Sequence, residues 1–307
     1  MRNDAQITEL APRPGACAGR VGVHSRMVDF LELSKPRMNF LVLVTTAVGY
    51  YMAVRHSFQW MALLHTLLGT AMTAAAASAL NQISERVYDG MMKRTADRPL
   101  PARRLAPGEA LVFALALMVA GVSYLALMVN VLTAVLGAFT LATYVLLYTP
   151  LKRQTTLCTV VGAIPGAIPP VMGCAAVEGR ISPDAIALFL VLFLWQMPHF
   201  LAIAILYRDD YARAGFKMLP VVDRSLAITG RQIMLYSAAM LPATLLPVVL
   251  NMAGLTYLGM AIVLGLAFMS FSMSCAVTGG RTEARRLFIA SIVYLPALLA
   301  AMMLDKV

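Results

Sequence analysis

Charged residues are scarce in this chain of 307 residues: they make up 13% of it, while 60% of the residues are hydrophobic. A soluble protein of this length needs many more polar residues to cover its surface. The mean hydropathy of +0.76 points the same way. The composition therefore excludes a fold surrounded by water and predicts an integral membrane protein.

Cysteine and histidine are also scarce, with four residues of each. The cysteines form no Cys-x-x-Cys pair, so they indicate neither a disulfide framework nor a zinc site. Three of the histidines, His24, His56 and His65, belong to no motif. These cysteines and histidines therefore indicate no metal site.

Long apolar runs begin only after residue 30. Residues 1–30 are polar and contain no apolar core that a cleaved signal peptide would need, so we expect a disordered cytoplasmic tail there. Residues 31–307 are expected to form a single polytopic domain. Each run is close to the roughly 20 residues that span a membrane. The runs cover about 38–54, 58–82, 110–129, 131–149, 158–177, 185–207, 233–250, 255–277 and 287–304.

The net charge of +10 is distributed very unevenly between the two ends of these spans. Only Arg55, Arg180 and Lys306, of 25 Lys and Arg, fall at one end. The positive-inside rule places the other end, and the N-terminus, in the cytoplasm and the C-terminus outside. This distribution indicates contact with a membrane surface and argues against nucleic acid as a partner. A bacterial inner membrane is the expected location.

Asn81, Glu85 and Asp89 recur at every fourth position where the second apolar run ends. On a helix this spacing puts all three on one face, within an arc of about 80°. Oxygen ligands of this kind suit Mg²⁺, which leaves its other positions to water and phosphate. The alternative is a solvated helix end with surface ion pairs.

A second acidic pair, Asp209 and Asp210, ends the sixth run at the same predicted end of the bundle. Together with the first group it could complete a divalent-metal site for a diphosphate, or it could be a solvated helix cap. Lys152 and Arg153 close the fourth run, either as membrane anchors or as phosphate ligands. His199 follows Pro198 inside the sixth run and is either structural or a ligand exposed by a break in the helix.

These motifs, in this order, resemble the UbiA-type membrane prenyltransferases, and several resemble the branch of that family that farnesylates haem. The resemblance extends over nearly the whole chain after the tail. The segments that carry it are Leu33-Ser-Lys-Pro-Arg37, Asn81-x-x-x-Glu85-x-x-x-Asp89, Arg94-Thr-Ala-Asp-Arg-Pro-Leu-Pro101, Tyr148-Thr-Pro-Leu-Lys-Arg153, Trp195-Gln-Met-Pro-His-Phe200 and Asp209-Asp-Tyr211 with Met218-Leu-Pro220.

The resemblance implies an all-α membrane bundle of about nine helices around a central cavity, capped by cytoplasmic loops. It implies transfer of farnesyl from farnesyl diphosphate to the 2-vinyl group of haem b, which gives haem o. Proteins of haem a synthesis or terminal-oxidase assembly would be partners. The implied Mg²⁺ ligands and catalytic residues are Asn81, Glu85, Asp89, Asp209 and Asp210. The implied substrate-binding residues are Lys93, Arg94, Arg98, Tyr148, Lys152, Arg153, His199 and Tyr211.

The sequence departs from the family pattern in two places. Glu85 stands where many members have Asp, and Ala214 stands where a second acid often follows Asp210 by four residues. Three alternatives remain open. A UbiA-type enzyme could use a quinone precursor or another aromatic acceptor. A transporter would normally show repeats and a midplane charge, and neither is evident here. A non-catalytic assembly subunit is the third.

Overall fold

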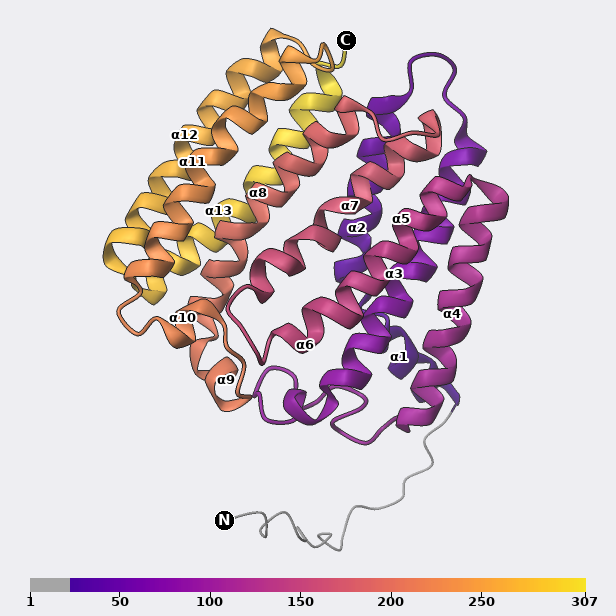
Figure 1. The fold of residues 1–307 in the computed structure, drawn as a ribbon, viewed down its shortest axis with the longest axis vertical. Helices are drawn as coiled ribbons and strands as arrows, with labels where there is room; N and C mark the ends of the chain where they lie inside the picture. The colour runs from indigo at the N-terminus through magenta and orange to yellow at the C-terminus, as the bar shows by residue number, and fades with distance from the viewer. Residues whose placement is uncertain (1–22) are drawn as a thin grey trace, which may run out of the picture.

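The computed structural model describes residues 23–307, and these residues form an all-helical bundle (Figure 1). Its helices are α1 (Val23–Leu33), α2 (Pro36–Ala53), α3 (Trp60–Asp89), α4 (Pro107–Met128), α5 (Val131–Ala142), the π-helix η1 (Thr143–Tyr148), α6 (Thr149–Leu151), α7 (Cys158–Glu178), α8 (Pro183–Leu206), α9 (Arg208–Arg213), α10 (Leu219–Val222), α11 (Ala227–Val249), α12 (Leu255–Thr278) and α13 (Arg281–Leu304).

Eight spans in the described part of the chain are long and apolar enough to cross a membrane, with α5, η1 and α6 counted as one. Helix α2 has 18 residues but a polar beginning, Pro-Arg-Met-Asn, which lowers its mean hydropathy. It lies in the same bundle as the other eight (Figure 1). The prediction of an all-α integral membrane protein with many spans is confirmed.

Helices α2 and α7 pack with their backbones almost in contact. A Cβ added at Gly49 would lie 2.0 Å from the carbonyl oxygen of Pro170, and one added at Gly173 would lie 2.1 Å from that of Thr46. Only glycine permits so close an approach, because any side chain would collide with backbone that cannot move aside. This contact holds the first and fifth spans together.

Helix α1 begins at Val23, within the range 1–30 that was expected to be a disordered tail. Residues 23–30, expected to be irregular, are helical, while residues 1–22 lie outside the described part. Phe30 and Leu33 pack beneath Phe113 and Leu105 in a small apolar cluster, and Asp29 pairs with Arg104 at 2.9 Å. Burial of apolar surface and an ion pair between the buried Asp29 and the exposed Arg104 order this segment, and neither could be read from local composition.

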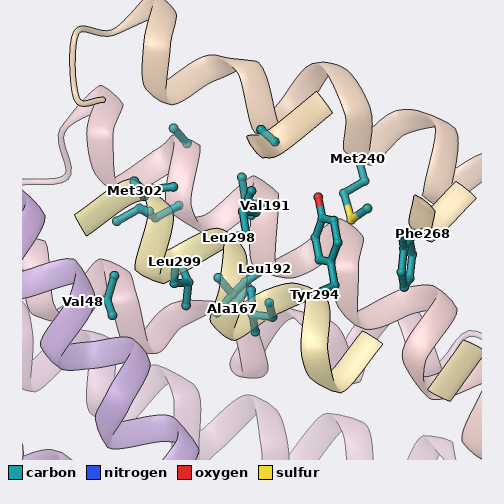
Figure 2. Packing of buried hydrophobic residues seen from close by; sticks show 14 of the residues in the cluster. Val48, Ala167, Val191, Leu192, Met240, Phe268, Tyr294, Leu298, Leu299 and Met302 are labelled. Atoms are coloured by element: carbon teal, nitrogen blue, oxygen red, sulfur yellow. The ribbon is translucent and has the colours of Figure 1, made fainter. Parts of the chain in front are cut away.

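The main apolar core lies among α2, α7, α8, α11, α12 and α13. Figure 2 shows Val191, Leu192, Leu298 and Leu299 meeting at the centre of it. Helix α8 continues through Pro198 without a break, so the expected break beside His199 does not form. Neighbouring helices enclose the proline and support the surrounding turns, as in other membrane helices.

Candidate active site

Helix α3 is the element that positions the predicted site. Its 30 residues measure about 45 Å, more than a ~30 Å hydrocarbon core requires, so its last turns extend beyond the core. Asn81, Glu85 and Asp89 lie on its inner face and are 1%, 5% and 1% exposed, whereas Ser84 and Arg86 between them face outward. The alternative of a solvated helix end is therefore wrong.

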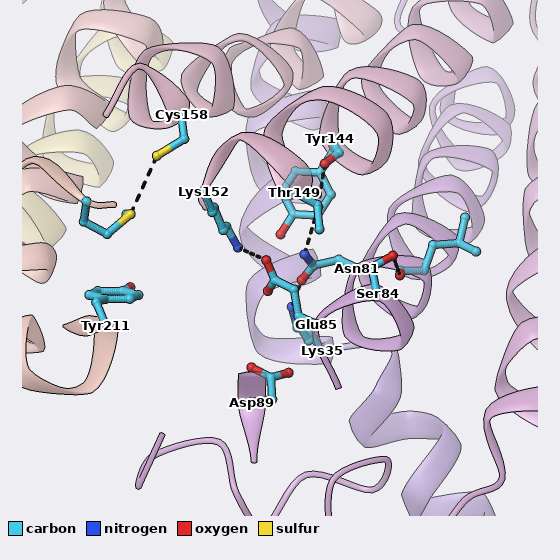
Figure 3. Close-up of polar contacts among 12 residues, drawn as sticks. Lys35, Asn81, Ser84, Glu85, Asp89, Tyr144, Thr149, Lys152, Cys158 and Tyr211 are labelled. Atoms are coloured by element: carbon cyan, nitrogen blue, oxygen red, sulfur yellow. Dashed lines mark hydrogen bonds and ion pairs between the residues drawn. The ribbon is translucent and has the colours of Figure 1, made fainter. Parts of the chain in front are cut away.

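Each of these three side chains has a cationic partner from a different segment. Figure 3 shows the pair of Lys152 and Glu85. Lys35 Nζ donates to Asn81 Oδ1 at 3.0 Å, and Lys152 Nζ donates to Glu85 Oε1 at 2.7 Å. The Arg98 guanidinium donates to Asp89 Oδ2 at 2.8 Å. Three successive turns of α3 are thus contacted by cationic side chains from the α1–α2 junction, the α3–α4 loop and the end of α6.

Lys35 occupies an unusual backbone position between α1 and α2. Its φ of 49° lies in the left-handed region, and Pro36 follows it as the first residue of α2. This turn directs the side chain inward to Asn81. Burial, together with the positive charges of Arg98 and Lys152, lowers the pKa of Lys35 to about 7. An ammonium in this setting gains from any additional negative charge nearby.

The π-helix η1 shapes the opposite wall of the site. A single wide turn covers residues 143–148. In it the Thr149 N–H donates to the carbonyl oxygen of Tyr144, five positions earlier, instead of the four positions of an α-helix. Thr149 Oγ1 then accepts from Asn81 Nδ2 at 3.1 Å. The rings of Tyr144 and Tyr148 lie 5.3 Å apart beside it. Such π segments are rare and occur mainly at functional sites.

Lys152 lies directly after this segment and is buried. Its ammonium lies 4.4 Å from the centre of the Tyr148 ring as well as against Glu85. Burial works against the charged form, but the Glu85 carboxylate outweighs it, and the pKa of Lys152 is raised. Burial, a carboxylate and an aromatic face together hold this cation in one position.

The oxygen atoms on α3 fit a divalent ion. Asp89 Oδ1 is buried and has no hydrogen-bond partner among residues 23–307, and an unpaired buried carboxylate oxygen is costly unless a cation binds it. The donors offered by Asn81, Glu85 and Asp89 are an amide oxygen and two carboxylates, which is the hard-oxygen set that Mg²⁺ prefers.

The second acidic pair lies at the same end of the bundle, on α9 (Figure 1), but does not join the first group. Asp209 is exposed, and Asp210 pairs with Arg213 on its own helix. Within residues 23–307 no group of three or more His, Cys, Asp and Glu side chains is close enough to hold a metal ion. The role of Asp209 and Asp210 in metal binding stays a prediction.

Aromatic and cationic side chains connect α9 to the first group. Arg94 donates to the Tyr211 hydroxyl at 2.9 Å and lies 5.0 Å from the ring centres of both Tyr207 and Tyr211. Arg153 lies over the Tyr88 ring at 4.4 Å.

A backbone hydrogen bond joins the loop after α9 to the end of α6: Lys217 N donates to the carbonyl oxygen of Lys152 at 2.7 Å. Lys93, in the loop after α3, is exposed.

His199 belongs to a separate group on α8 and α13. Its Nδ1 lies 2.7 Å from Ser291 Oγ, its ring stacks on Trp195 at 4.9 Å, and Phe288 lies 5.2 Å away. Trp195 Nε1 also donates to the Ser291 carbonyl at 3.0 Å. These contacts of His199 are with Ser291, Trp195 and Phe288, and not with the oxygens of Asn81, Glu85 or Asp89 on α3.

Three residues of the site escaped the sequence interpretation: Lys35, Tyr144 and Thr149. Lys35 and Thr149 lie in segments that carry the family resemblance, but neither was assigned a role in the site, and Tyr144 belongs to no motif. The π turn that brings Tyr144 and Thr149 to Asn81 cannot be read from residue types.

The fold and this site define a class: a polytopic helical membrane protein with buried oxygen ligands and cations at one end, suited to a phosphorylated substrate. The model of the UbiA prenyltransferase family matches residues 42–301, and the chain belongs to this family. It is similar to the protoheme IX farnesyltransferase of Solibacter usitatus, with 47% identity over 91% of this chain and 99% of the relative.

Solved structures agree on the fold. One of a digeranylgeranylglyceryl phosphate synthase covers 91% of this chain and 98% of its own at 16% identity, with a TM-score of 0.75. One of a UbiA homolog from Archaeoglobus fulgidus, bound to DMAPP and Mg²⁺, covers 89% of this chain and 99% of its own at 16% identity, with a TM-score of 0.63.

Proposed function

We propose that this enzyme transfers the farnesyl group of farnesyl diphosphate to the 2-vinyl group of haem b and so produces haem o. The observation that carries the proposal is the buried face of Asn81, Glu85 and Asp89, met by three cations from separate segments. The farnesyltransferase relative of 47% identity supports the choice of donor and acceptor. The DMAPP and Mg²⁺ of the Archaeoglobus structure support a divalent ion with a prenyl diphosphate.

Asn81, Glu85 and Asp89 would hold Mg²⁺, and we propose Asp209 and Asp210 as its further ligands from α9. The unpaired Asp89 Oδ1 is the atom most in need of such a partner. When bound, Mg²⁺ neutralises the diphosphate and makes it a better leaving group. For α9 to contribute, Asp210 must exchange Arg213 for the ion.

The cations of the site would bind the phosphate oxygens. Lys152 and Arg98 contact the carboxylates of Glu85 and Asp89, so small rotations can transfer their donors to a diphosphate beside those carboxylates. Lys93, Arg94 and Arg153 line the outer layer, where Arg94 and Arg153 lie on tyrosine rings. Charge held in place before the reaction stabilises the departing diphosphate at little reorganisation cost.

Breaking the C1–O bond of the donor leaves the electron pair on diphosphate and an allylic cation on the farnesyl group. The haem vinyl group supplies the electrons for the new carbon–carbon bond, and water captures the resulting cation with loss of one proton. Tyr148 and Tyr211 are proposed to face the substrates, with aromatic rings that stabilise positive charge. His199 is proposed to contact haem from α8.

The expected orientation follows from the charges. The proposed site lies at the end that holds nearly all Lys and Arg, which would face the cytoplasm of a bacterium and its supply of diphosphates. Proteins of haem a synthesis or oxidase assembly are proposed to receive the product, because a farnesylated haem is too apolar to leave the membrane readily.

Expression in a strain that lacks haem o, followed by mass spectrometry of extracted haems, tests the proposal. The wild type should yield a haem enlarged by one farnesyl group and one hydroxyl group, and Asp89→Asn should not. Asp97→Asn is the matched control, because Asp97 is an exposed acid in the loop that follows. Unmodified haem from a well-expressed wild type, or a prenylated aromatic product in its place, would refute the assignment.

A further inference from the structure

Two of the three cations at the end of the bundle remote from the proposed site meet at one hollow. Arg55 follows α2 and Lys306 follows α13, and both line a hollow of about 380 Å³ together with His56. The third, Arg180, pairs with Glu178 nearby in sequence. The positive-inside rule depletes cations at this end, so it does not account for Arg55 and Lys306, 251 positions apart, lining the same hollow.

Backbone and side-chain contacts fix both cations and still leave donors unused. Lys306 Nζ donates to the carbonyl oxygens of Tyr51 and Val54 at 2.6 and 2.5 Å, which uses two of its three N–H groups. Arg55 donates to Asp184 at 2.7 Å through one terminal nitrogen and to the Val307 oxygen at 3.4 Å through the other. The remaining N–H groups are available to an anion in the hollow.

The two positive charges also affect each other. Burial, followed by the charge of Arg55, lowers the pKa of Lys306. An anion placed between the two cations would relieve this repulsion. His56 is exposed at the mouth of the hollow and adds a further hydrogen-bonding group there.

A second hollow, of about 640 Å³, continues from the first and is almost wholly apolar. Tyr51, Phe58 and Met303 line both hollows. The Lys306 ammonium lies 4.6 Å from the centre of the Tyr51 ring. Val44, Ala47 and Leu63 extend the apolar wall along α2 and α3 toward the middle of the membrane.

An aromatic group marks the depth of this site in the bilayer. Phe58 lies 4.5 Å from Trp60 and 5.6 Å from Tyr50, measured between ring centres, and Trp60 is 73% exposed. Exposed tryptophan at the end of a span is typical of the interface between head groups and hydrocarbon. The cationic hollow therefore lies at the level of the head groups, and the apolar hollow lies at the level of the acyl chains.

We propose that the paired hollows bind one anionic phospholipid of the adjoining leaflet. Its phosphate lies between Arg55 and Lys306, and one acyl chain lies past Tyr51 in the groove between α2, α3 and α13. The site is separate from the proposed prenyl-transfer site and does not depend on it. A bound lipid there joins the first span to the last.

Native mass spectrometry of the purified wild-type protein tests the proposal, after exchange into detergent with phosphatidylglycerol or phosphatidylcholine. We expect one phosphatidylglycerol per chain to be retained, at least fivefold more than phosphatidylcholine. Ala47→Phe fills the groove and should abolish retention, while Val263→Phe, on the exposed face of α12, should leave it unchanged. Arg55→Gln should remove the preference for phosphatidylglycerol but leave weak binding of both lipids.

Three results would overturn the proposal: no lipid retained by the wild type, equal retention of both lipids, or equal retention by Ala47→Phe and Val263→Phe. The same measurement with inorganic phosphate, palmitate or haem in place of the lipid tests whether another compound occupies the hollows. Competition by phosphate alone, or stronger retention of palmitate or haem than of phosphatidylglycerol, would also refute it. If Ala47→Phe does not fold, Met303→Trp narrows the same groove from α13 and replaces it in the comparison.

Discussion

Lys35 Nζ donates a hydrogen bond to Asn81 Oδ1 at 3.0 Å, although 46 positions separate the two residues in sequence. The bond joins the start of the first span to the end of the second, at the buried face that we propose holds the metal. Asn81 is also fixed from its other side, because its Nδ2 donates to Thr149. One amide thus connects three segments of the site.

Replacing Lys35 by methionine should lower kcat/KM for farnesyl diphosphate about tenfold or more, a loss of ~1.4 kcal/mol in transition-state stabilisation. The reason is the loss of a half-buried positive charge beside the proposed diphosphate position. Arg37→Met is the control, because Arg37 is exposed two residues away. Steady-state assays with varied farnesyl diphosphate make the comparison, and an equal loss in both variants would contradict the role given to Lys35.

The Glu85–Lys152 pair should show strong coupling in stability. Glu85→Gln leaves a buried ammonium without its carboxylate, and breaking such a pair costs about 3–5 kcal/mol. The double variant Glu85→Gln with Lys152→Met removes both charges and should recover most of the unfolding temperature while remaining inactive. Thermal unfolding in detergent measures this cycle. A double variant less stable than Glu85→Gln alone would count against the coupling.

The contact between α2 and α7 should not tolerate a methyl group. Gly173→Ala would place a Cβ 2.1 Å from the Thr46 carbonyl oxygen, so we expect destabilisation of about 3 kcal/mol, the upper range for overpacking. Gly259→Ala on α12 meets nothing within 4 Å and should be neutral or stabilise by up to about 1 kcal/mol. Equal unfolding temperatures for the two variants would show that the helices can separate.

The hydrogen bonds accepted by Asp223 should make the stability of the folded protein fall at acid pH. Burial favours its neutral form, but hydrogen bonds from the Thr229 backbone N–H, the Thr229 hydroxyl and Ser225 outweigh burial and lower its pKa. The folded pKa lies below the unfolded value, so the stabilisation is complete above the unfolded pKa of about 3.9 and is lost as pH falls through the folded pKa.

Asp223→Asn should therefore reduce stability at pH 7 by about 1 kcal/mol, because hydrogen bonds accepted by a charged carboxylate are stronger than those accepted by a neutral amide. The difference from wild type should shrink as pH falls below about 4. Unfolding temperatures of both proteins across pH 3 to 7 measure it, and a difference that stays constant to pH 3 would exclude this carboxylate as the cause.

The spans were predictable because membrane helices obey a length and hydropathy rule that acts residue by residue. The predicted range 255–277 and helix α12, Leu255–Thr278, nearly coincide for this reason. The order of residues 23–30 was not predictable, because it comes from contacts with Arg104 and Phe113 far along the chain. Pro198 misled the interpretation because neighbouring helices, not the local sequence, decide whether a proline breaks a membrane helix.

The face of Asn81, Glu85 and Asp89 was predictable from helical spacing alone. The cations that contact this face were predictable only in part, because the sequence interpretation included Lys152 and Arg98 among the site residues but not Lys35. Residue types also could not show that Asp210 pairs with Arg213 on its own helix. Contacts between segments depend on how the helices pack, which spacing within one segment does not encode.

The central claim is that Asp89 holds a divalent ion to which farnesyl diphosphate binds. Titration calorimetry of the purified protein with farnesyl diphosphate, with and without Mg²⁺, tests it most directly. We expect Mg²⁺ to strengthen the binding of farnesyl diphosphate to wild type and to Asp97→Asn, and this gain should be lost in Asp89→Asn. Unchanged affinity and Mg²⁺ dependence in a folded Asp89→Asn protein would contradict it.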